Sequence, residues 1–386
     1  MCRVRVALVG LISIHFAAIC SAITERIPVE QPIEIPLSHE FAWKDSKSVA
    51  NQSFLNAESS AAKASDFYQI FTGDTQYYFP CTPENDECAK LCNEQSKECV
   101  IKQARYSNKV QRQSIGSLIK QLAAVGHKPR SIIINGDLTD YGHPEELNAF
   151  KVQWEQPIDG VRMFPGLGNH DIQNNIEDCA MNHCGNRMMR YFISYLGKEL
   201  NIRADYRQTN DFLFAEYQGS FAYSWNECSS TNSSQCVHFV QLNNHPTYER
   251  SFEFPIAKWI INSTLEWLSD DLAANVDHPV VINFHRYDED FPQPDRLAFR
   301  DVISNQGSHI LAIVFAHFHS SIGVKDNWCI NGRNVPLMFS GSVPGNNYLL
   351  IRFADDYRSL ANVYSLHATG SNQTIVTRLN IATSCS

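Results

Sequence analysis

The sequence predicts an α/β fold in which a β-sandwich core is flanked by helices. Short runs rich in Val, Ile and Phe have the composition of buried strands, and they occupy residues 67–72, 131–135, 161–165, 236–242, 279–284 and 309–316. Helical patterns lie between the early runs, and strand patterns dominate after residue 334. This alternation, followed by antiparallel-looking strands, is typical of one large layered domain.

The chain begins with a segment that has the properties of a signal peptide. Residues 1–22 carry Arg3 and Arg5, then an apolar run, then the small residues Ser21 and Ala22. We therefore expect a secreted or secretory-lumen protein, with a polar N-terminal extension over residues 23–65. No later stretch has the length of apolar sequence that a spanning helix needs, so no membrane span is expected.

The remaining boundaries follow from the strand and helix patterns. We expect the main domain over residues 66–345, with strands at 346–386 that complete the same domain. Residues 108–125 predict a helix with apolar side chains on one face, Ser107 as its N-cap and Gly126 after its end.

Two prolines mark expected helix starts. Pro144 stands where a first helical turn accepts proline. Pro255 is expected to open a later helix that holds Trp259, Leu265 and Leu268.

Ten cysteines follow the predicted signal peptide, an even number in an oxidising compartment, so disulfides are expected. Cys179 with Cys184 and Cys228 with Cys236 suggest local bridges, and Cys329 with Cys385 suggests a longer one. A disulfide-rich insert is expected from the cluster of Cys81, Cys88, Cys92 and Cys99. Zinc binding by this cluster is the alternative.

N-glycosylation sequons agree with passage through the secretory pathway. They lie at Asn51, Asn232, Asn262 and Asn372. The formal net charge is −9, and removal of Arg3 and Arg5 makes it more negative. A duplex nucleic acid is not an expected partner, because such a surface needs a basic stripe.

Polar clusters follow most of the early strands, and they contain residues that bind metal ions. The stretches "GDTQ", "NGDLTD", "GNHD", "NFHRYD" and "AHFHSS" deliver the candidate side chains. These are Asp74, Asp137, Asn169, His170, Asp171, His285, His317 and His319. Residues just past the carboxyl ends of strands converge on one crevice in an α/β sheet, so these distant residues can meet.

These residue types suit a pair of metal ions. A carboxylate such as Asp137 can bridge two cations, and two metals about 3.5 to 4 Å apart can convert a bridging water into a nucleophilic hydroxide. The cations also neutralise phosphoryl oxygens during displacement. His170 stands beside a ligand without being needed as one, so it is placed to protonate the leaving oxygen.

Each stretch alone has an ordinary structural explanation. A single aspartate after a strand is usually a turn or a helix cap, and "GNHD" alone is a glycine turn with polar neighbours. The order of all five stretches is what favours a metal site.

With this order of motifs the chain resembles the calcineurin-like metallophosphoesterase superfamily, whose pattern is Asp-x-His, Gly-Asp, Gly-Asn-His, a single His, and Gly-His-x-His. The resemblance runs from Asp74 to His319 and implies a β-sandwich core with a dinuclear site. It implies that Asp137 bridges the metals, that His170 is the general acid, and that Asp171 orients His170. The remaining implied ligands are Asp74 and His319 for the first metal, and Asn169, His285 and His317 for the second.

The chain departs from the family pattern at three positions. Gln76 replaces the usual histidine of the first motif, and its amide oxygen favours harder ions such as Mn²⁺ or Mg²⁺ over Zn²⁺. Ala316 stands where a glycine often precedes the last histidine pair. Asp140 stands where purple acid phosphatases carry tyrosine. Two divalent or trivalent ions, from among Mn, Mg, Fe and Zn, are the expected cofactors.

The expected activity is the hydrolysis of a phosphate mono- or diester. His143, Asn244 and His245 are candidates for substrate contact, together with the loop Asp288–Asp290. Branches with a similar first or second motif suggest a nucleotide diphosphatase or a cyclic nucleotide phosphodiesterase as alternatives. A binding protein that has lost catalysis is the rival hypothesis, which Gln76 favours. The sequence leaves the substrate and the oligomeric state open.

Overall fold

The computed structural model describes residues 62–63, 66–83, 85–92, 96–211, 214–229, 235–369, 372–379 and 385. The side chains of residue 369 and of 372–379 are not described. All of these residues belong to one compact unit, Lys47–Ser386. The expected signal peptide, almost all of the expected extension, the sequons at Asn51 and Asn232 and the side chain of Asn372 lie outside the described part.

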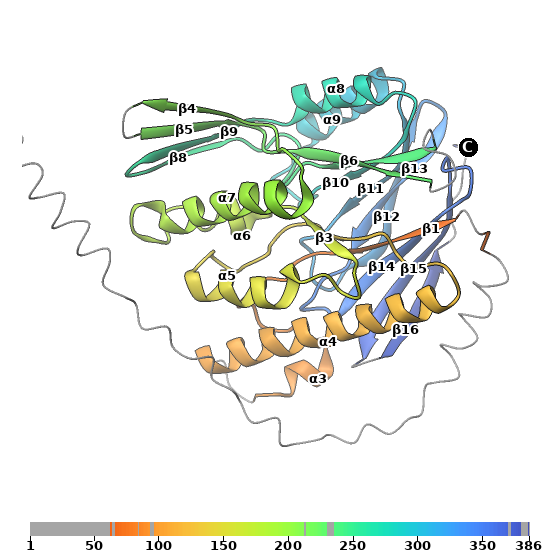
Figure 1. The fold of residues 1–386 in the computed structure, drawn as a ribbon, viewed down its shortest axis with the longest axis horizontal. Coiled ribbons are helices and arrows are strands. Elements are labelled where there is room, and N and C mark those ends of the chain that lie inside the picture. Colours follow the sequence, from red (N-terminus) through yellow and green to blue (C-terminus); the bar gives the residue numbers. More distant parts are fainter. Residues whose placement is uncertain are drawn as a thin grey trace, which may run out of the picture. The chain divides into compact units, whose positions relative to one another are not determined.

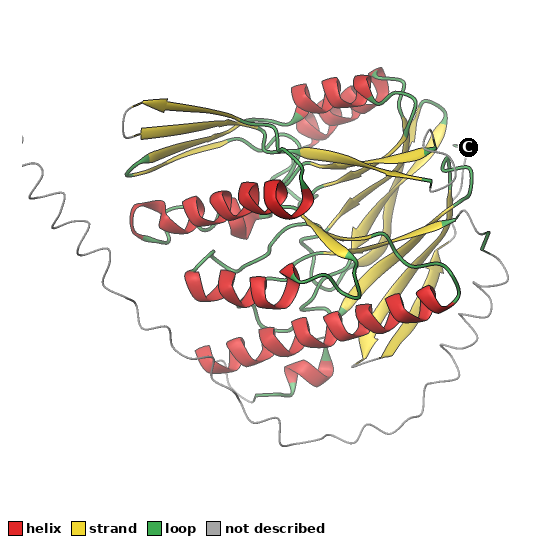
Figure 2. Cartoon of the chain, in the orientation of Figure 1, coloured by secondary structure: helices red, strands yellow, loops and turns green. Residues whose placement is uncertain are grey.

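Two six-stranded mixed sheets form the framework (Figures 1 and 2). The first has the order β16-β15-β14-β1-β2-β3. Its strands are β1 (Phe67–Thr72), β2 (Ser131–Ile134), β3 (Arg162–Pro165), β14 (Asn347–Phe353), β15 (Leu360–Thr369) and β16 (Asn372–Leu379). Strands β1, β2 and β3 are parallel, and the C-terminal strands β14 to β16 continue the sheet by antiparallel pairing.

The second sheet has the order β12-β13-β11-β10-β7-β6. Its strands are β6 (Tyr223–Cys228), β7 (Cys236–Gln241), β10 (Pro279–Asn283), β11 (His309–Phe315), β12 (Ile322–Ile330) and β13 (Arg333–Ser340). The four central strands are parallel and buried, while β6 and β12 pair antiparallel at the edges. The six runs that the sequence predicts as strands are therefore all strands.

Strands β1, β2 and β14 of the first sheet and β7 and β10 of the second are buried along their whole length, so each sheet is covered on both faces. Phe353 of the first sheet lies edge-on to Phe239 of the second, with ring centroids 5.7 Å apart, inside one apolar core shared by both sheets. The helix α4 (Lys97–Ala124) packs against the outer face of the first sheet. The helices α8 (Leu265–Ala274) and α9 (Gln293–Asn305) pack against the outer face of the second. The predicted sandwich flanked by helices is confirmed.

The helix α4 is longer than predicted. Its N-cap is Ser96, whose hydroxyl accepts a hydrogen bond from the Cys99 amide, so the expected cap at Ser107 is wrong. Ser107 lies inside the helix and donates to the carbonyl oxygens of Gln103 and Ala104. A buried serine that bonds to its own preceding turn does not interrupt a helix.

The helix expected after Pro255 is also wrong. Ala257–Ile261 forms strand β9, in which alternate residues are buried, and Trp259 stacks on Tyr217 at 4.2 Å. Helix α8 begins only at Leu265. Strand β9 belongs to a small third sheet of order β4-β5-β9-β8 with β4 (Arg207–Asp211), β5 (Phe214–Gly219) and β8 (Arg250–Phe254).

Seven further helical segments lie among the described residues. Pro144 begins α5, as predicted. The segments are α3 (Asp86–Ala89), α5 (Pro144–Phe150), η1 (Lys151–Glu155), α6 (Asn169–Ile172), η2 (Ala180–Asn182), α7 (His183–Tyr195) and η3 (Leu196–Leu200). Among the described residues, no helix combines the length and the apolar character that crossing a membrane requires.

The ten cysteines after the predicted signal peptide form five disulfides in the structure. The two local pairs and the longer pair are those that the sequence suggested, and the cluster near residue 90 forms two bridges. The pairs are Cys81–Cys88, Cys92–Cys99, Cys179–Cys184, Cys228–Cys236 and Cys329–Cys385.

Candidate metal centre

The candidate ligands come from loops at the carboxyl ends of parallel strands in both sheets. Asp74, Asp137 and Asn169 follow β1, β2 and β3 of the first sheet, and His285 and His317 follow β10 and β11 of the second. Backbone hydrogen bonds join these loops: the Asp74 amide donates to Gly136 O at 3.0 Å, and the His317 amide donates to Asp74 Oδ2 at 3.3 Å. The two sheets therefore bring the predicted ligands to one place.

The backbone at these loops is strained. Asp74, Gln76, Asp137 and His317 all have positive φ, at 50°, 34°, 51° and 72°. Left-handed φ costs a residue other than glycine about 1 to 2 kcal/mol, so the fold holds these four positions against a local preference. Strain of this kind concentrates at functional sites.

The two glycines of the central motifs permit close approach of the loops. A Cβ at Gly168 would lie 2.2 Å from Asp137 Oδ1. A Cβ at Gly136, which has φ +84°, would lie 2.8 Å from the His285 ring. Side chains at either position would displace a predicted ligand, which is the physical reason for the Gly-Asp and Gly-Asn-His sequences.

The predicted second metal position is a cluster of buried acceptor atoms. The Nδ1 atom of His285 donates to Asn135 O at 2.7 Å, so Nε2 is the ring atom directed into the cluster. This Nε2 lies 3.0 Å from Asp137 Oδ2, 3.0 Å from Asn169 Oδ1 and 3.3 Å from His317 Nδ1. Electron-rich atoms this close require a cation or a proton between them.

Asp288 sets the orientation of His317. The Nε2 atom of His317 donates to Asp288 Oδ2 at 2.9 Å, which leaves Nδ1 directed toward His285. The Asp288 carboxylate is held in turn by Arg286, whose Nε lies 3.0 Å away. A carboxylate behind a histidine that binds metal fixes its tautomer and raises its basicity. Sequence reasoning placed Asp288 among substrate contacts and missed this role, because no motif spacing reports it.

The predicted first metal position lies around Asp74. Its Oδ1 is fully buried, has no hydrogen-bond donor among the described residues, and lies 3.5 Å from His319 Nε2. Gln76 is 1% exposed, and neither atom of its amide has a hydrogen-bond partner among the described residues. Its backbone amide donates to Asp137 O at 2.8 Å, which fixes Gln76 beside the bridging aspartate. Unpaired buried oxygens are costly without a cation.

The charges agree with a cation-binding centre. Burial raises the pKa of Asp137, but the histidines around it, His285 first, outweigh burial and hold the pKa below its usual value. Asp137 is therefore an anion at neutral pH although it is fully buried. Asp137, His285 and His317 form a group whose ligand atoms all lie within 4.8 Å of one another. The donor set thus fits hard or borderline metal ions.

His170 lies beside Asp137 and is held by Asp140. Its amide donates to Asp137 Oδ1 at 2.8 Å, and its Nδ1 donates to Asp140 O at 2.7 Å and lies 3.1 Å from Asp140 Oδ1. Burial lowers the pKa of His170, but Asp137 and Asp140 outweigh it and raise the pKa to about 10. The Nε2 atom of His170 remains to carry a proton toward a substrate.

Asp171 has a different position from the one expected. Its carboxylate accepts hydrogen bonds from the amides of Leu138, Thr139 and Gly168, at 3.0 to 3.2 Å, and the Thr139 hydroxyl also donates to it. Burial and the charge of Asp137 raise its pKa to about 7. Asp171 therefore anchors the loop after Asp137, and Asp140 is the carboxylate that contacts His170.

The three candidates for substrate contact lie in different surroundings. His143 lies between two carboxylates, Glu146 and Asp178. Asn244 donates to Gln173 Oε1 at 3.0 Å, and its own Oδ1 has no partner in the described structure. His245 packs against Phe291 and Tyr248, and burial together with Arg286 lowers its pKa to about 4, so it is neutral.

Two aromatic rings beside His170 were not anticipated. Phe79 lies edge-on to His319 at 4.6 Å and to His170 at 6.4 Å, and Tyr141 lies edge-on to His170 at 5.8 Å. Both rings are partly exposed. They form an apolar border beside the expected acid. Cys81 of the Cys81–Cys88 bridge lies two residues after Phe79 in the sequence.

A comparison with models of protein families identifies the family of this chain. The model described as calcineurin-like phosphoesterase matches residues 69–321. The chain belongs to this family. Its members are generally metal-dependent phosphoesterases and typically bind two metal ions, which agrees with the buried group of Asp137, His285 and His317.

Other comparisons are distant. A search of curated proteins finds no match. Among solved structures, a 5'-nucleotidase from Candida albicans has 8% identity and a TM-score of 0.47 over 78% of this chain and 52% of its own. A sulfate thiohydrolase from Thermus thermophilus has 10% identity and a TM-score of 0.42 over 79% and 56%. The chain thus spans about half the length of these two.

A calcineurin-like phosphoesterase from Bacillus subtilis has 13% identity and a TM-score of 0.39 over 83% of this chain and 90% of its own. None of these likenesses bears on the substrate of this protein.

The structure also explains how this family member accommodates Ala316. The Cβ of Ala316 occupies the space beside Gly73, where an added Cβ would lie 2.4 Å away. The alanine is tolerated because the residue before Asp74 is glycine.

Proposed function

We propose that this phosphoesterase is a secreted hydrolase of phosphate mono- or diesters that uses two metal ions and His170 as general acid. The observation that carries the proposal is the convergence of electron-rich atoms around Asp137, where oxygen and nitrogen acceptors face one another without enough donors. The five disulfides support the expected secretion, because such bonds persist in oxidising compartments.

The ligand set divides around Asp137. We propose that Asp74 and His319 hold the first cation, with the amide oxygen of Gln76 as a further ligand. Asn169, His285 and His317 would hold the second, and Asp137 would contribute to both positions. When bound, the two cations lower the pKa of a water molecule that acts as nucleophile and neutralise charge on the phosphoryl oxygens.

The protein itself supplies orientation and a proton. Asp288 and Asn135 O fix the ring orientations of His317 and His285. Asp140 fixes His170 through Nδ1, so that Nε2 carries the proton for the leaving oxygen. The negative charges of Asp137 and Asp140 keep His170 protonated at neutral pH, which suits an acid.

The test is hydrolysis by purified protein reconstituted with Mn²⁺, Mg²⁺, Zn²⁺ or Fe²⁺. The substrate panel contains phosphate monoesters, diesters, cyclic nucleotides, nucleotide diphosphates and phospholipid-like esters, with Asp137→Asn as the control. We expect metal-dependent turnover that Asp137→Asn abolishes. If no metal supports such turnover, the binding-protein hypothesis replaces this proposal.

A further inference from the structure

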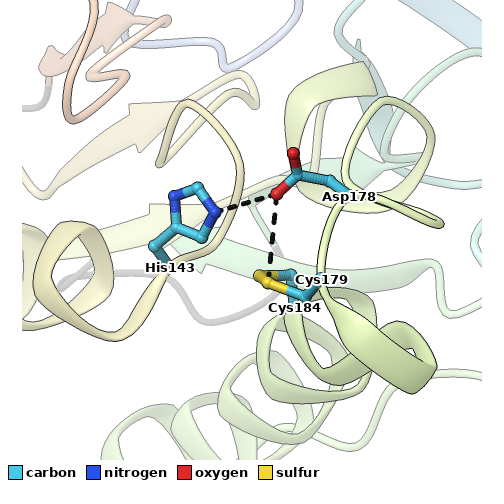
Figure 3. A group of neighbouring side chains, drawn as sticks. All are labelled: His143, Asp178, Cys179 and Cys184. Atoms are coloured by element: carbon cyan, nitrogen blue, oxygen red, sulfur yellow. Dashed lines mark hydrogen bonds and ion pairs between the residues drawn. A yellow bond between two sulfur atoms is a disulfide. The ribbon is translucent and has the colours of Figure 1, made fainter.

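A second group of metal-ligand side chains lies outside the candidate centre. His143, Asp178, Cys179 and Cys184 place one possible ligand atom each within 4.8 Å of the others (Figure 3). The described residues contain one other such group, which belongs to the candidate centre. In the structure the two sulfurs form a disulfide, and His143 Nε2 donates to Asp178 Oδ2 at 2.8 Å. The cluster is therefore closed to metal while the disulfide is intact.

The two sulfurs of this disulfide differ in their surroundings. Cys179 is partly exposed, whereas Cys184 is fully buried at the second position of α7, a helix of 13 residues. The Arg187 guanidinium donates to Cys184 Sγ at 3.6 Å. A helix N-terminus and a neighbouring cation both stabilise a thiolate. Attack at Cys179 would therefore release Cys184 as a stabilised leaving group.

The neighbours of the sulfurs form the rest of a metal site. A site with two thiolates, one imidazole and one carboxylate suits a tetrahedral Zn²⁺ ion. Ligand atoms around such an ion lie about 3.3 to 3.8 Å apart, as follows from bond lengths of about 2.0 to 2.3 Å. Reduction must therefore let the two bonded sulfurs separate, while the His143 and Asp178 ligand atoms already lie within 4.8 Å of them. The His143 Nδ1 atom lies 2.8 Å from Glu146 Oε1, which holds the ring with Nε2 directed toward Asp178.

We propose that reduction of the Cys179–Cys184 disulfide opens a site for a thiophilic divalent cation such as Zn²⁺, with His143 and Asp178 as the other ligands. The reductant is a dithiol. One of its thiolates attacks Cys179 Sγ, the S–S bond breaks, and Cys184 leaves as thiolate. The second thiol attacks the mixed disulfide and releases Cys179, so the reductant becomes a cyclic disulfide and two protons pass to solvent. The cation then binds the two thiolates.

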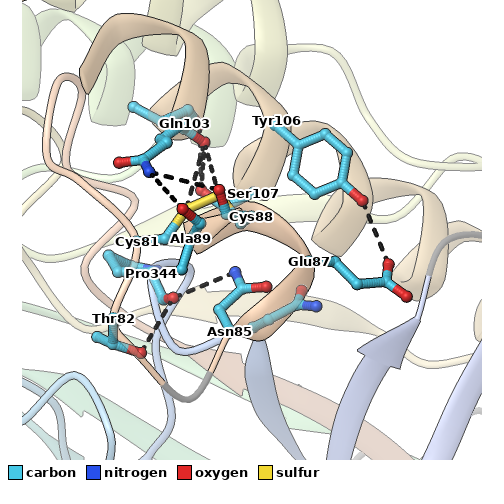
Figure 4. The surroundings of a disulfide bond; sticks show 12 residues. Cys81, Thr82, Asn85, Glu87, Cys88, Ala89, Gln103, Tyr106, Ser107 and Pro344 are labelled. Atoms are coloured by element: carbon cyan, nitrogen blue, oxygen red, sulfur yellow. Dashed lines mark hydrogen bonds between the residues drawn. A yellow bond between two sulfur atoms is a disulfide. The ribbon is translucent and has the colours of Figure 1, made fainter. Parts of the chain in front are cut away.

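The Cys81–Cys88 bridge is a matched control. It also joins a partly exposed cysteine to a fully buried one. The residues labelled around this bridge in Figure 4 carry amide, hydroxyl and carbonyl groups but no imidazole. The one labelled carboxylate, that of Glu87, accepts a hydrogen bond from the Tyr106 hydroxyl. This bridge therefore lacks the groups that would complete a metal site.

The first measurement is reduction of the whole folded protein over a series of dithiol concentrations. Alkylation and mass spectrometry identify the open bridges, and circular dichroism reports folding. We expect Cys179–Cys184 to open at a lower dithiol concentration than Cys81–Cys88 while the protein remains folded. The proposal fails if Cys179 and Cys184 stay paired until the protein unfolds.

The second measurement adds Co²⁺ to the reduced protein after the candidate centre has been loaded with Mn²⁺. Cobalt bound by thiolate gives a sulfur-to-metal charge-transfer band that the oxygen and nitrogen ligands of the centre cannot give. We expect the band to reach its full intensity at one equivalent of bound Co²⁺ in wild type and in the Cys81→Ser/Cys88→Ser variant. Added Zn²⁺ should displace the Co²⁺ and abolish the band. Oxidised protein and Cys179→Ser/Cys184→Ser should lack it, and Asp178→Asn should weaken Co²⁺ binding by about tenfold or more.

Two results would overturn the assignment of the ligands. One is absence of the band when alkylation shows that Cys179 and Cys184 are both reduced. The other is a band of equal strength in Cys179→Ser/Cys184→Ser, which would place the cobalt on other thiols.

Discussion

The contact between His317 and Asp288 makes a quantitative prediction for Asp288→Asn. Asp288 Oδ2 accepts from His317 Nε2 at 2.9 Å, and its carboxylate is nearly buried, with 3% of the side chain exposed. Loss of a carboxylate behind a histidine ligand typically lowers metal affinity 10- to 100-fold, which corresponds to about 1.4 to 2.7 kcal/mol. We expect a loss of this size at one of the two metal positions, with the other unchanged.

The assay is calorimetric titration of metal-free protein with Mn²⁺ and with Zn²⁺, together with the metal dependence of hydrolysis. Asp290→Asn is the matched control, because Asp290 also contacts Arg286 but is 42% exposed and has no contact with His317 among those described. A change that acts through Arg286 would appear in both variants. If Asp288→Asn binds both metals like wild type, or if Asp290→Asn loses the same affinity, Asp288 does not orient His317.

Three further predictions concern the acid and the first metal position. His170→Gln should lower kcat/KM for alkyl phosphoesters by about 10²- to 10⁴-fold and have a much smaller effect on aryl esters with acidic leaving groups; equal losses on both esters would exclude His170 as the acid. Asp140→Asn removes a negative charge 3.1 Å from His170 Nδ1, which lowers the pKa of His170. If the protonated ring is the general acid, as proposed, the alkaline limb of the kcat/KM profile should move to lower pH, and an unmoved limb would contradict the role of Asp140. Gln76→His replaces an amide oxygen by an imidazole, so metal titration should show a higher affinity for Zn²⁺ relative to Mn²⁺ or Mg²⁺. An unchanged ratio of these affinities would mean that Gln76 does not coordinate.

The strands were predictable because their burial is continuous. Runs such as Ile132–Ile134 and Ile310–Phe315 are buried on both faces between a sheet and a helix layer, and this gives unbroken apolar sequence. Helix boundaries were harder. In the early turns of α4 the buried residues are small or polar, namely Cys99, Gln103, Ala104, Ser107 and Asn108. Val100 and Ile101 are only partly buried, so the apolar signal for a helix is weaker there.

Strand β9 shows how tertiary context overrides a local signal. Pro255 favours a helix start, but the backbone of Ala257–Ile261 pairs with β5 and β8, and Trp259 is fully buried. Pro255 therefore stands in the turn between two strands and not at a helix start.

The motif residues of the candidate site were predictable because each follows a strand in a fixed order. Asp140 and Asp288 were not assigned their contacts, because their partners His170 and His317 lie 30 and 29 residues away along the chain. Contacts of this kind depend on how loops fold over one another, which neither periodicity nor spacing reports. The same holds for Phe79 and Tyr141 beside His170.

The central claim is that the acceptor atoms around Asp137 hold two cations. The most direct measurement is anomalous diffraction from crystals of the protein soaked with Mn²⁺ or Zn²⁺. We predict two peaks with Asp137 between them, one bound by Asp74 and His319 and the other by Asn169, His285 and His317. A single peak, or peaks that these side chains do not contact, would contradict the account.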